Sequence, residues 1–454
     1  MNLPNYFLAD LPHEATLTPP MLEEACQTLK RNRARFLANR STQNLIVALS
    51  SLAGRWLEAD YPFRKFALEL GPGETGFSRA TLAGGLDSLF KELTPQNLRA
   101  LLEQDLGHAD RLDAMTSAEL ERRSNRASMA CAPELQVHLA AGNLPNPVLL
   151  SIVFGLLVRS AQFVKCAHGS ALLPRLFAHS LYEAEPKLGA CLEIAEWRGG
   201  NTDLETVLFA QADCVTATGS DEMLAAIRPR LPSHARLLGY GHRVSFGYVA
   251  SSMLSDLNAR KAAACAAADV AAWNQVGCLS PHVIYVQQHG ARSPEQFAEM
   301  LAEELARIEE THPRGALPVQ TAAAIASRRS IYEVRAAHSP DTRHWASQDS
   351  TAWTVVYEAD PRFQLSCLYR FIYVKPADNL TEALLNAESV RGKISTVGLA
   401  APEDQTLALA TELARWGVPR VCPLGRMQHP PLAWRHDGRP TLGDLITWTD
   451  LEMP

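Results

Sequence analysis

Short apolar runs alternate with helix-length segments through the middle of the chain. Each run ends in small or polar residues before the next helical segment begins. Short strands that alternate with helices are typical of a parallel α/β sheet. The predicted strands are residues 137–140, 162–167, 191–197 and 214–217.

The same alternation returns in the last third of the chain. Ser293, Pro294 and Glu295 supply a cap, a first-turn proline and an acid, so they predict the start of a helix. The sequence therefore predicts a second α/β region over residues 280–425. Its predicted elements are a helix at 294–310, strands at 352–358 and 369–374, and a helix at 406–416; an Ala-rich helix at 255–273 precedes them.

The first 130 residues are predicted to be mostly helical. Charges at helical spacing, with Ala, Leu and Met between them, predict helices over 21–37 and 110–129. Breaks are predicted at Leu70-Gly71-Pro72-Gly73 and at Gly84-Gly85. After a turn at 436–440, the sequence predicts a short amphipathic tail.

Composition narrows the class of protein. The 454 residues suffice for two or three domains of roughly 100–200 residues each. A net charge of −6 gives no basic excess for a nucleic-acid partner. The longest apolar run, Pro147 to Val158, is shorter than the ~20 residues of a membrane-spanning helix.

The cysteine pattern and the N-terminal sequence predict the cellular compartment of the protein. The nine cysteines include no CxxC pair, which favours a reducing compartment over a disulfide framework. The N-terminal sequence has no basic region followed by an apolar stretch, so we expect no signal peptide. The sequence therefore predicts a cytoplasmic protein.

Cys278 is the candidate nucleophile. Gly277 precedes it, and the Ser280-Pro281 break follows it, directly before the apolar run 283–286. A loop between regular elements would present a thiol, and the thiolate is the form that attacks. Because a free cysteine is usually buried and inert, the sequence alone leaves both interpretations open.

Three further segments carry candidate site residues. Asn143, in Ala141-Gly142-Asn143-Leu144-Pro145-Asn146-Pro147, would be an oxyanion donor or a turn residue. Lys165 follows an apolar strand and would bond a nucleotide or lie in solvent. Thr218, Gly219 and Ser220 precede a predicted helix start, which suits a pyrophosphate or a plain helix cap.

Other kinds of chemistry have weaker signals. His138, His242 and His282 are candidate acids or bases, although each is more often structural in such positions. The sequence has no HExxH motif and no Cys/His ligand spacing, so we expect no metal site. It also has no GxSxG nucleophile elbow.

Taken in order, these segments resemble the aldehyde dehydrogenase superfamily, and most closely its acyl-CoA reductase branch, the LuxC-type fatty acid reductases of bacterial bioluminescence. The resemblance covers nearly the whole chain. The matching pieces are His138 with Ala141 to Pro147, Lys165 in FVKCA, TGSDE at 218–222, Gly239 to Arg243, Gln275 to Pro281, Ser395 to Gly398, Trp434 to Gly438, Leu445 to Trp448, and the N-terminal segments 61–64 and 75–78.

The resemblance implies an α/β fold of the aldehyde dehydrogenase type: a Rossmann-like cofactor domain, a second α/β catalytic domain and a helical N-terminal region. The implied domains are 1–130, helical and part of the cofactor-binding domain; 131–256, which binds NAD(P); 257–425, which carries the nucleophile; and 426–454, a tail that takes part in oligomerisation.

The resemblance also implies roles for the candidate residues. Cys278 is similar to the nucleophile of this family, and Asn143 to its oxyanion-stabilising asparagine. Lys165 resembles the lysine that binds the adenosine ribose, and Thr218, Gly219 and Ser220 resemble the loop under the pyrophosphate. The implied cofactor is NADPH, and the implied substrate is an acyl-CoA or an acyl-carrier protein. A homo-oligomer, with acyl-transfer or acyl-activating partner subunits, is also implied.

One departure distinguishes between activities. Hydrolytic aldehyde dehydrogenases place a glutamate in an ELGG motif, whereas the corresponding stretch here, Leu237 to His242, has no carboxylate. Without that base, water attacks an acyl-enzyme poorly, which favours reduction of a thioester. A hydrolytic aldehyde dehydrogenase and a non-catalytic scaffold on the same fold stay as alternatives.

Overall fold

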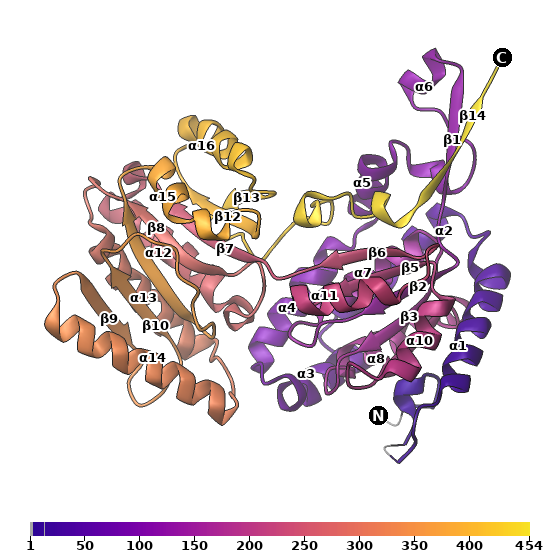
Figure 1. The fold of residues 1–454 in the computed structure, drawn as a ribbon, viewed down its shortest axis with the longest axis horizontal. Helices are drawn as coiled ribbons and strands as arrows, with labels where there is room; N and C mark the ends of the chain where they lie inside the picture. The colour runs from indigo at the N-terminus through magenta and orange to yellow at the C-terminus, as the bar shows by residue number, and fades with distance from the viewer. Residues whose placement is uncertain (1–2, 13) are drawn as a thin grey trace.

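The computed structural model describes residues 3–12 and 14–454 and consists of two α/β lobes (Figure 1). One lobe contains a five-stranded parallel sheet in the order β4-β3-β2-β5-β6. Its strands are β2 (Leu135–Leu139), β3 (Ala161–Cys166), β4 (Leu192–Glu196), β5 (Cys214–Thr218) and β6 (Arg236–Tyr240). Because these strands are parallel, their carboxyl ends lie at one edge of the sheet.

The other lobe contains a seven-stranded sheet in the order β13-β12-β7-β8-β11-β10-β9. All neighbours in it are parallel except β9 and β10. Its strands are β7 (Val244–Val249), β8 (Pro281–Gln287), β9 (Thr342–Ala346), β10 (Thr354–Glu358), β11 (Phe371–Ala377), β12 (Ile394–Ala400) and β13 (Val421–Pro423). The α/β class with two separate sheets, predicted from the sequence, is confirmed.

Helices cover both sheets, and the N-terminal helices belong to the first lobe (Figure 1). The helices of the first lobe are α1 (Pro19–Asn32), α2 (Thr42–Leu57), α3 (Pro62–Thr75), α4 (Arg79–Glu92), α5 (Pro95–Leu106), α7 (Asn146–Leu157), α8 (Leu172–Ala184), α9 (Pro186–Gly189), α10 (Thr202–Gln211) and α11 (Asp221–Ile227). Those of the second lobe are α12 (Asp256–Ala271), α13 (Pro294–Thr311), α14 (Val319–His338), α15 (Leu380–Asn386) and α16 (Glu403–Trp416).

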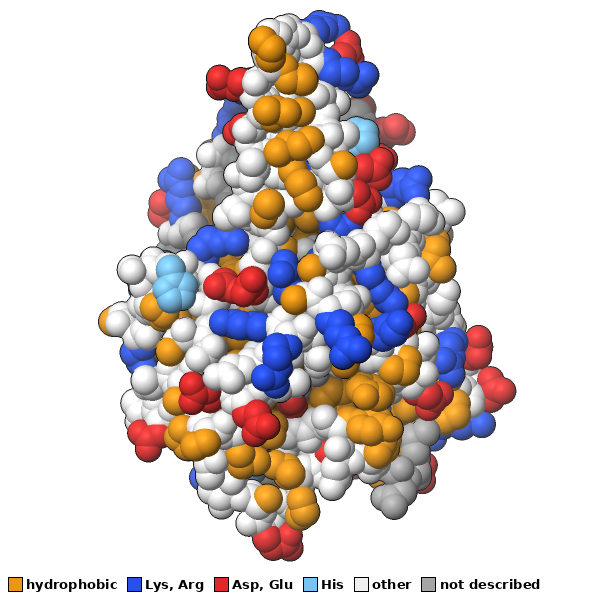
Figure 2. Space-filling view, turned by 90° about the vertical axis from the view of Figure 1, so that its right-hand side faces the viewer, with side chains coloured by type: hydrophobic (Ala, Val, Ile, Leu, Met, Phe, Trp, Pro, Cys, Tyr) orange, Lys and Arg blue, Asp and Glu red, His pale blue; other side chains and the backbone are white. Residues whose placement is uncertain are grey.

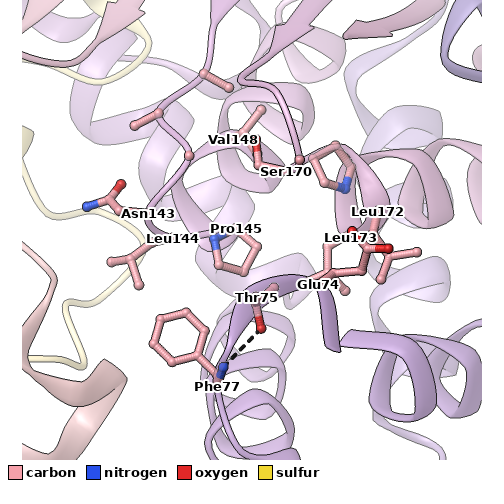
Figure 3. A pocket seen from close by; sticks show the side chains of 15 residues that line it. Glu74, Thr75, Phe77, Asn143, Leu144, Pro145, Val148, Ser170, Leu172 and Leu173 are labelled. Carbon is pink, nitrogen blue, oxygen red and sulfur yellow. Dashed lines mark hydrogen bonds between the residues drawn. The ribbon is translucent and has the colours of Figure 1, made fainter. Parts of the chain in front are cut away.

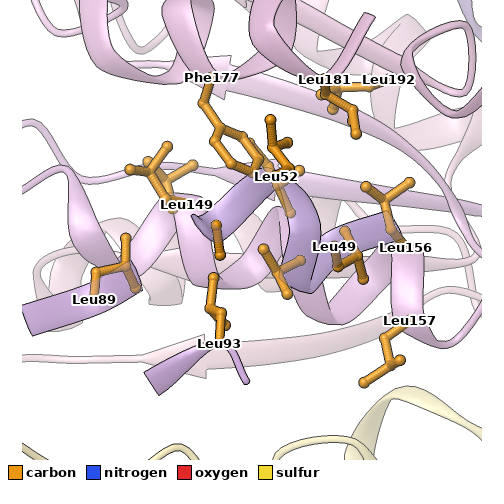
Figure 4. Packing of buried hydrophobic residues seen from close by; sticks show 14 of the residues in the cluster. Leu49, Leu52, Leu89, Leu93, Leu149, Leu156, Leu157, Phe177, Leu181 and Leu192 are labelled. Carbon is orange, nitrogen blue, oxygen red and sulfur yellow. The ribbon is translucent and has the colours of Figure 1, made fainter. Parts of the chain in front are cut away.

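The core of the first lobe is organised around the apolar helix α7. Leu149 and Leu156 of α7 pack against Leu49 of α2 and Phe177 of α8 (Figure 4). Full burial of one such side chain contributes about 1.5–3 kcal/mol. This core fixes the segment just before α7, where the candidate Asn143 lies.

A two-stranded arm projects from the first lobe. It pairs β1 (Arg126–Cys131) antiparallel with β14 (Thr447–Glu452), and α6 (Glu119–Arg123) lies near its tip (Figure 1). Apolar side chains form a column along the arm (Figure 2). The exposed large hydrophobic residues in these elements and beside them are Met115, Leu120, Trp448, Leu451 and Met453.

Three local predictions are wrong. The predicted helix over 110–129 is replaced by a 3-10 turn, the short α6 and the strand β1, because β1 pairs with β14 from the far end of the chain. The predicted breaks at residues 70–73 and at Gly84-Gly85 are absent, since α3 continues through Pro72 to Thr75 and α4 continues through both glycines. These errors come from local signals that tertiary packing overrides.

The chain changes from the first sheet to the second between Tyr240 and Val244. This change precedes the expected domain boundary after residue 256, because β7 pairs with β8 and β12. The chain returns to the first lobe after β13 (Figure 1). Within the part of the chain that the structure describes, no helix combines the length and the apolar character needed to cross a bilayer.

Candidate active site

The candidate nucleophile lies on a backbone segment of unusual conformation between α12 and β8. Trp273, Asn274 and Gln275 all have positive φ, at 49°, 51° and 64°. Such values cost a non-glycine residue on the order of 1–3 kcal/mol and persist only where the surroundings enforce them. We call residues 273–280 the nucleophile loop.

Buried amide side chains enforce this conformation. The Gln275 side chain donates to the carbonyls of Pro281 and Phe371, at 2.8 and 2.9 Å, and accepts from the N–H of Phe371 at 2.8 Å. Asn274 donates from Nδ2 to the carbonyl of Arg314 at 2.8 Å. Each of these bonds satisfies a buried backbone group, so the loop is tied to β8 and β11.

Trp273 ties the same loop to the first lobe. Its indole packs beside the ring of Phe77, with centroids 5.2 Å apart, and directly over Gly85 of α4. A methyl group on Gly85 would lie 2.0 Å from Cζ2 of Trp273, so only glycine fits there. The nucleophile loop is therefore held from both lobes.

The Cys278 thiol opens onto a cavity between the lobes. Cys278 is partly exposed, and its backbone carbonyl accepts a hydrogen bond from the Ser245 hydroxyl at 2.7 Å. Burial raises the pKa of the thiol to about 11, and the charge of Asp437 adds to the rise, while Ser395 and Arg243 oppose it. The free thiol is thus protonated at neutral pH and needs a proton acceptor to react.

The space beside Cys278 is lined by the first sheet, by the nucleophile loop and by the C-terminal segment. We call it the thiol cavity; its volume is 1290 Å³, including the space at its open mouth. Thr218 and Tyr240 from the first sheet line it together with Cys278 and Leu279. The rest of the wall is mainly apolar, with Leu89, Leu144, Pro147, Leu150, Phe154, Trp273, Pro430, Pro431, Leu432, Trp434 and Leu445.

Asn143 lies beside the nucleophile loop and is exposed. Its Nδ2 donates to the carbonyl of Val276 at 3.2 Å, and Leu144, next in sequence, lines the thiol cavity. Asn143 itself lines a neighbouring cleft with Phe77 and Ser170 (Figure 3). Since an amide nitrogen carries two protons, one donor remains for a ligand.

The remaining candidates lie at the carboxyl edge of the five-stranded sheet. Lys165 on β3 pairs in register with Leu139 on β2, which pairs with Ala217 on β5. Thr218 ends β5, and the Ser220 hydroxyl caps α11 by accepting from the N–H of Met223 at 3.2 Å. All of these residues therefore lie at one edge, with Asn143 just beyond β2.

Lys165 offers a test of whether this edge suits a dinucleotide. The side chain is 8% exposed, and burial lowers the pKa of its ammonium. Within residues 3–12 and 14–454, no hydrogen bond from this ammonium is found; its Nζ lies 5.7 Å from the ring centroid of Trp197. A lysine at the carboxyl edge of a parallel sheet, with its ammonium free of such bonds, fits the hydroxyls and phosphates of a nicotinamide dinucleotide.

The three candidate histidines are not brought to the thiol cavity. His138 is buried in β2, bonded to Gln162 at 2.7 Å, and burial lowers its pKa to about 4. His282 is buried at the start of β8 and contacts Ser366, with its pKa also lowered by burial to about 4. Among the described residues, no group of three His, Cys, Asp or Glu side chains is arranged to hold a metal ion.

The C-terminal segment brings further residues to the cavity that had no predicted role. His436 lines it, stacked on Tyr240 with centroids 4.5 Å apart, and Trp434 lies 4.8 Å from the same imidazole. Gln428 donates from Nε2 to the Ser280 hydroxyl at 2.7 Å. The sequence feature that could have indicated these residues is the segment Trp434 to Gly438. It is one of the pieces that carry the family resemblance, but no role was predicted for it.

Comparisons with known proteins indicate the family to which the chain is similar. The model of the family described as acyl-CoA reductase (LuxC) matches residues 37–448. The long-chain acyl-protein thioester reductase 2 of Photobacterium leiognathi is 23% identical over 70% of this chain and 64% of that protein, less than two thirds of its length. The long-chain acyl-protein thioester reductase of Photorhabdus laumondii is 21% identical over 90% of this chain and 82% of its own length.

A solved structure shows the fold. The indole-3-acetaldehyde dehydrogenase AldA of P. syringae, in complex with NAD+, superposes with a TM-score of 0.71 at 14% identity. The match covers 97% of this chain and 90% of AldA. The aldehyde dehydrogenase fold predicted from the sequence is therefore confirmed.

Proposed function

The chain belongs to the acyl-CoA reductase (LuxC) family, and on this premise we propose that it reduces an acyl thioester to an aldehyde with NADPH, through an acyl group bound to Cys278. One observation carries the proposal: Cys278 and Thr218 line the same cavity. A thiol that holds an acyl group and a loop that holds a dinucleotide must face one space if hydride is to reach the acyl carbon.

Cys278 and Asn143 carry the acyl chemistry in this proposal. The thiolate attacks the thioester carbonyl, and the pantetheine thiol leaves. The Asn143 amide and the backbone N–H of Cys278 stabilise the oxyanion. The bond from Asn143 to Val276, two residues before the thiol, supports this role because it holds the amide beside the nucleophile loop.

The apolar wall of the thiol cavity would hold the acyl chain. Leucine and proline side chains are the most frequent in it, and Leu279 adds one directly after the nucleophile. Burial of a chain on such a wall contributes about 0.8 kcal/mol per methylene. The proposed acyl donors are an acyl-CoA or an acyl-carrier protein. The family description names the first, and the names of the relatives favour an acyl group carried on a protein.

Lys165, Thr218, Gly219 and Ser220 would hold the cofactor. Lys165 would bond the adenosine ribose and the others the pyrophosphate. NADPH, when bound, supplies the hydride that reduces the acyl group. Lys165 supports this assignment, because it lies largely buried at the sheet edge and its ammonium makes no hydrogen bond with the residues that the structure describes.

The protein's partners and location are also part of the proposal. The projecting arm of β1 and β14, with its apolar column, is the proposed contact between copies of the chain. Partner subunits that transfer or activate acyl groups would deliver the substrate. A cytoplasmic location stays a prediction from the cysteine pattern.

The test is Cys278→Ala. We expect NADPH oxidation that depends on an acyl thioester to be abolished, with NADPH binding near the wild-type value, when nicotinamide absorbance is followed for a panel of acyl-CoAs and acyl-carrier proteins. Retained turnover in this variant would rule out the mechanism. Two controls test the alternatives. A non-catalytic scaffold would not be labelled by radioactive acyl-CoA, whereas the proposed enzyme would be. A hydrolytic aldehyde dehydrogenase would form acid from an aldehyde and NAD(P)+.

A further inference from the structure

The candidate nucleophile lies inside a tight turn of the nucleophile loop. The N–H of Ser280 donates to the carbonyl of Gly277 at 3.0 Å, so Cys278 and Leu279 are the two central residues of a four-residue turn. The bond that closes such a turn leaves the carbonyl between the two central residues without a partner in the turn. That carbonyl belongs to Cys278, and its orientation fixes ψ of this residue. The direction of the Cα–Cβ bond relative to the next strand therefore depends on what holds the carbonyl.

A buried hydroxyl from a neighbouring strand holds it. Ser245, the second residue of β7, is fully buried, and its Oγ donates to the carbonyl of Cys278 at 2.7 Å. The same oxygen accepts a hydrogen bond from the N–H of Thr396 on β12 at 3.1 Å. The hydroxyl proton and one lone pair are thus both in use, and the nucleophile loop is connected through one serine to the central strands of the seven-stranded sheet.

The sheet is irregular on both sides of this serine. The register between β12 and β7 skips Ser395, directly before the residue that pairs with Ser245. The register between β8 and β7 skips His282, directly after the residue that pairs with Ser245. Such extra residues bend a strand and change the direction of side chains, and they are over-represented beside active sites. The regular ladder is therefore interrupted where Ser245 reaches the nucleophile.

A second buried serine provides a comparison for a purely structural role. Ser180 of α8 is also fully buried, donates to the carbonyl of Phe177 at 2.7 Å and accepts from Nε1 of Trp56 at 2.9 Å. Its two bonds have nearly the same lengths as those of Ser245. The difference lies in the acceptor, because only Ser245 bonds to the residue that carries the nucleophile.

We propose that Ser245 is a positioning residue for Cys278, a role that rests on the proposed function. Ser245 does not line the thiol cavity, so it acts through Cys278 and not on the substrate. Attack requires the reacting atoms to be held about 3–3.5 Å apart with their orbitals aligned. A turn whose central carbonyl is free would hold the sulfur less firmly. Acyl transfer would then become slower, while the affinity for the acyl donor would stay the same.

The test measures acyl transfer in a single turnover. Full-length protein is mixed with radioactive dodecanoyl-CoA without NADPH, and the bound acyl group is counted against time at several concentrations of dodecanoyl-CoA. In Ser245→Ala we expect the maximal rate to fall about 30-fold, because a small displacement of a reacting group lowers a rate by up to about 100-fold. The half-saturating concentration of dodecanoyl-CoA and the final amount of acyl group per chain should change less than twofold.

The rate and the final amount distinguish positioning from a structural role. A variant that only loses folded protein would form less acyl-enzyme at the wild-type rate, and this result for Ser245→Ala would overturn the proposal. Ser180→Ala is the matched control: it should lower the free energy of unfolding in urea and keep the maximal rate within twofold. An equal fall of the rate in Ser180→Ala would also overturn the proposal. Ser245→Thr keeps the hydroxyl and should restore the rate to within about fivefold of the wild type.

Two further measurements keep the test decisive. If Ser245→Ala does not fold, Ser245→Cys is measured, because a thiol is a weaker donor than a hydroxyl. A fall of the rate by at least threefold supports the proposal, and a smaller fall overturns it. If the wild type forms no acyl-enzyme from dodecanoyl-CoA or from the corresponding acyl-carrier protein, the proposed function fails. If the wild type and Ser245→Ala form it at the same rate, only the role of Ser245 fails.

Discussion

Two loops meet at the thiol cavity, and they are built on different principles. The loop that ends β5 uses regular structure: Gly219 donates its N–H to the Tyr240 carbonyl at 3.1 Å, and Ser220 caps α11. The nucleophile loop instead has three left-handed residues held by buried amides. A dinucleotide can be held by the edge of any parallel sheet, whereas a reactive thiol must be fixed within a fraction of an ångström.

This difference predicts separate consequences of mutation. Removing side chains in the β5 loop should weaken cofactor binding and leave the fold nearly intact. Removing them in or beside the nucleophile loop should reduce turnover or destabilise the protein.

Among variants that keep the Cys278 thiol, the largest effect is expected for Asn143→Ala. Loss of one preorganised oxyanion donor costs about 3–4 kcal/mol in the transition state, so kcat should fall about 10²–10³-fold. NADPH oxidation with a saturating acyl thioester measures it. Binding of NADPH should not change, and a fall of less than tenfold would show that another group stabilises the oxyanion.

The next effect is expected for Gln275→Leu. This change keeps the volume but leaves the N–H and carbonyl of Phe371 and the carbonyl of Pro281 without their partner. Each unsatisfied buried group costs about 1–3 kcal/mol, so we expect the free energy of unfolding to fall by about 3 kcal/mol. Urea denaturation measures it, and a loss below about 1 kcal/mol would mean that the left-handed backbone needs no such support.

The contrast between the loops also explains what the sequence could reveal. Residues at the edge of the first sheet were predictable because strand ends follow directly from short apolar runs. Cys278 was predictable as a loop cysteine between a helix and a strand. The left-handed conformation of Trp273, Asn274 and Gln275 was not, since their contacts come from Phe371, Arg314 and Gly85, far away in the sequence.

The same limit applied to the C-terminal segment. The turn at 436–440 was expected, but the position of His436 at the thiol cavity depends on the return of the chain to the first lobe. The tail was expected to be amphipathic, and it becomes β14 only because β1 is there to pair with it. Contacts between distant segments leave no periodicity for a local pattern to report.

A smaller effect is expected for Lys165→Met. This change keeps the apolar stem and removes the ammonium, whose burial is costly without a ligand. We expect the KM for NADPH to rise about tenfold, equivalent to about 1.4 kcal/mol, while kcat changes less than twofold. Steady-state kinetics measures both values, and an unchanged KM would place the adenosine ribose elsewhere.

The smallest effect, and the closest test of the comparison, is expected for Ser220→Ala. Loss of this cap should cost about 1 kcal/mol of stability and raise the KM for NADPH severalfold, because the same hydroxyl faces the proposed pyrophosphate. Ser293→Ala is the matched control: Ser293 caps α13 by accepting from Gln296 at 3.2 Å, in the other lobe. It should cost as much stability and leave the KM unchanged. If both variants change the KM for NADPH alike, Ser220 has no special role in cofactor binding. The loop that ends β5 and the nucleophile loop would then differ only in backbone strain.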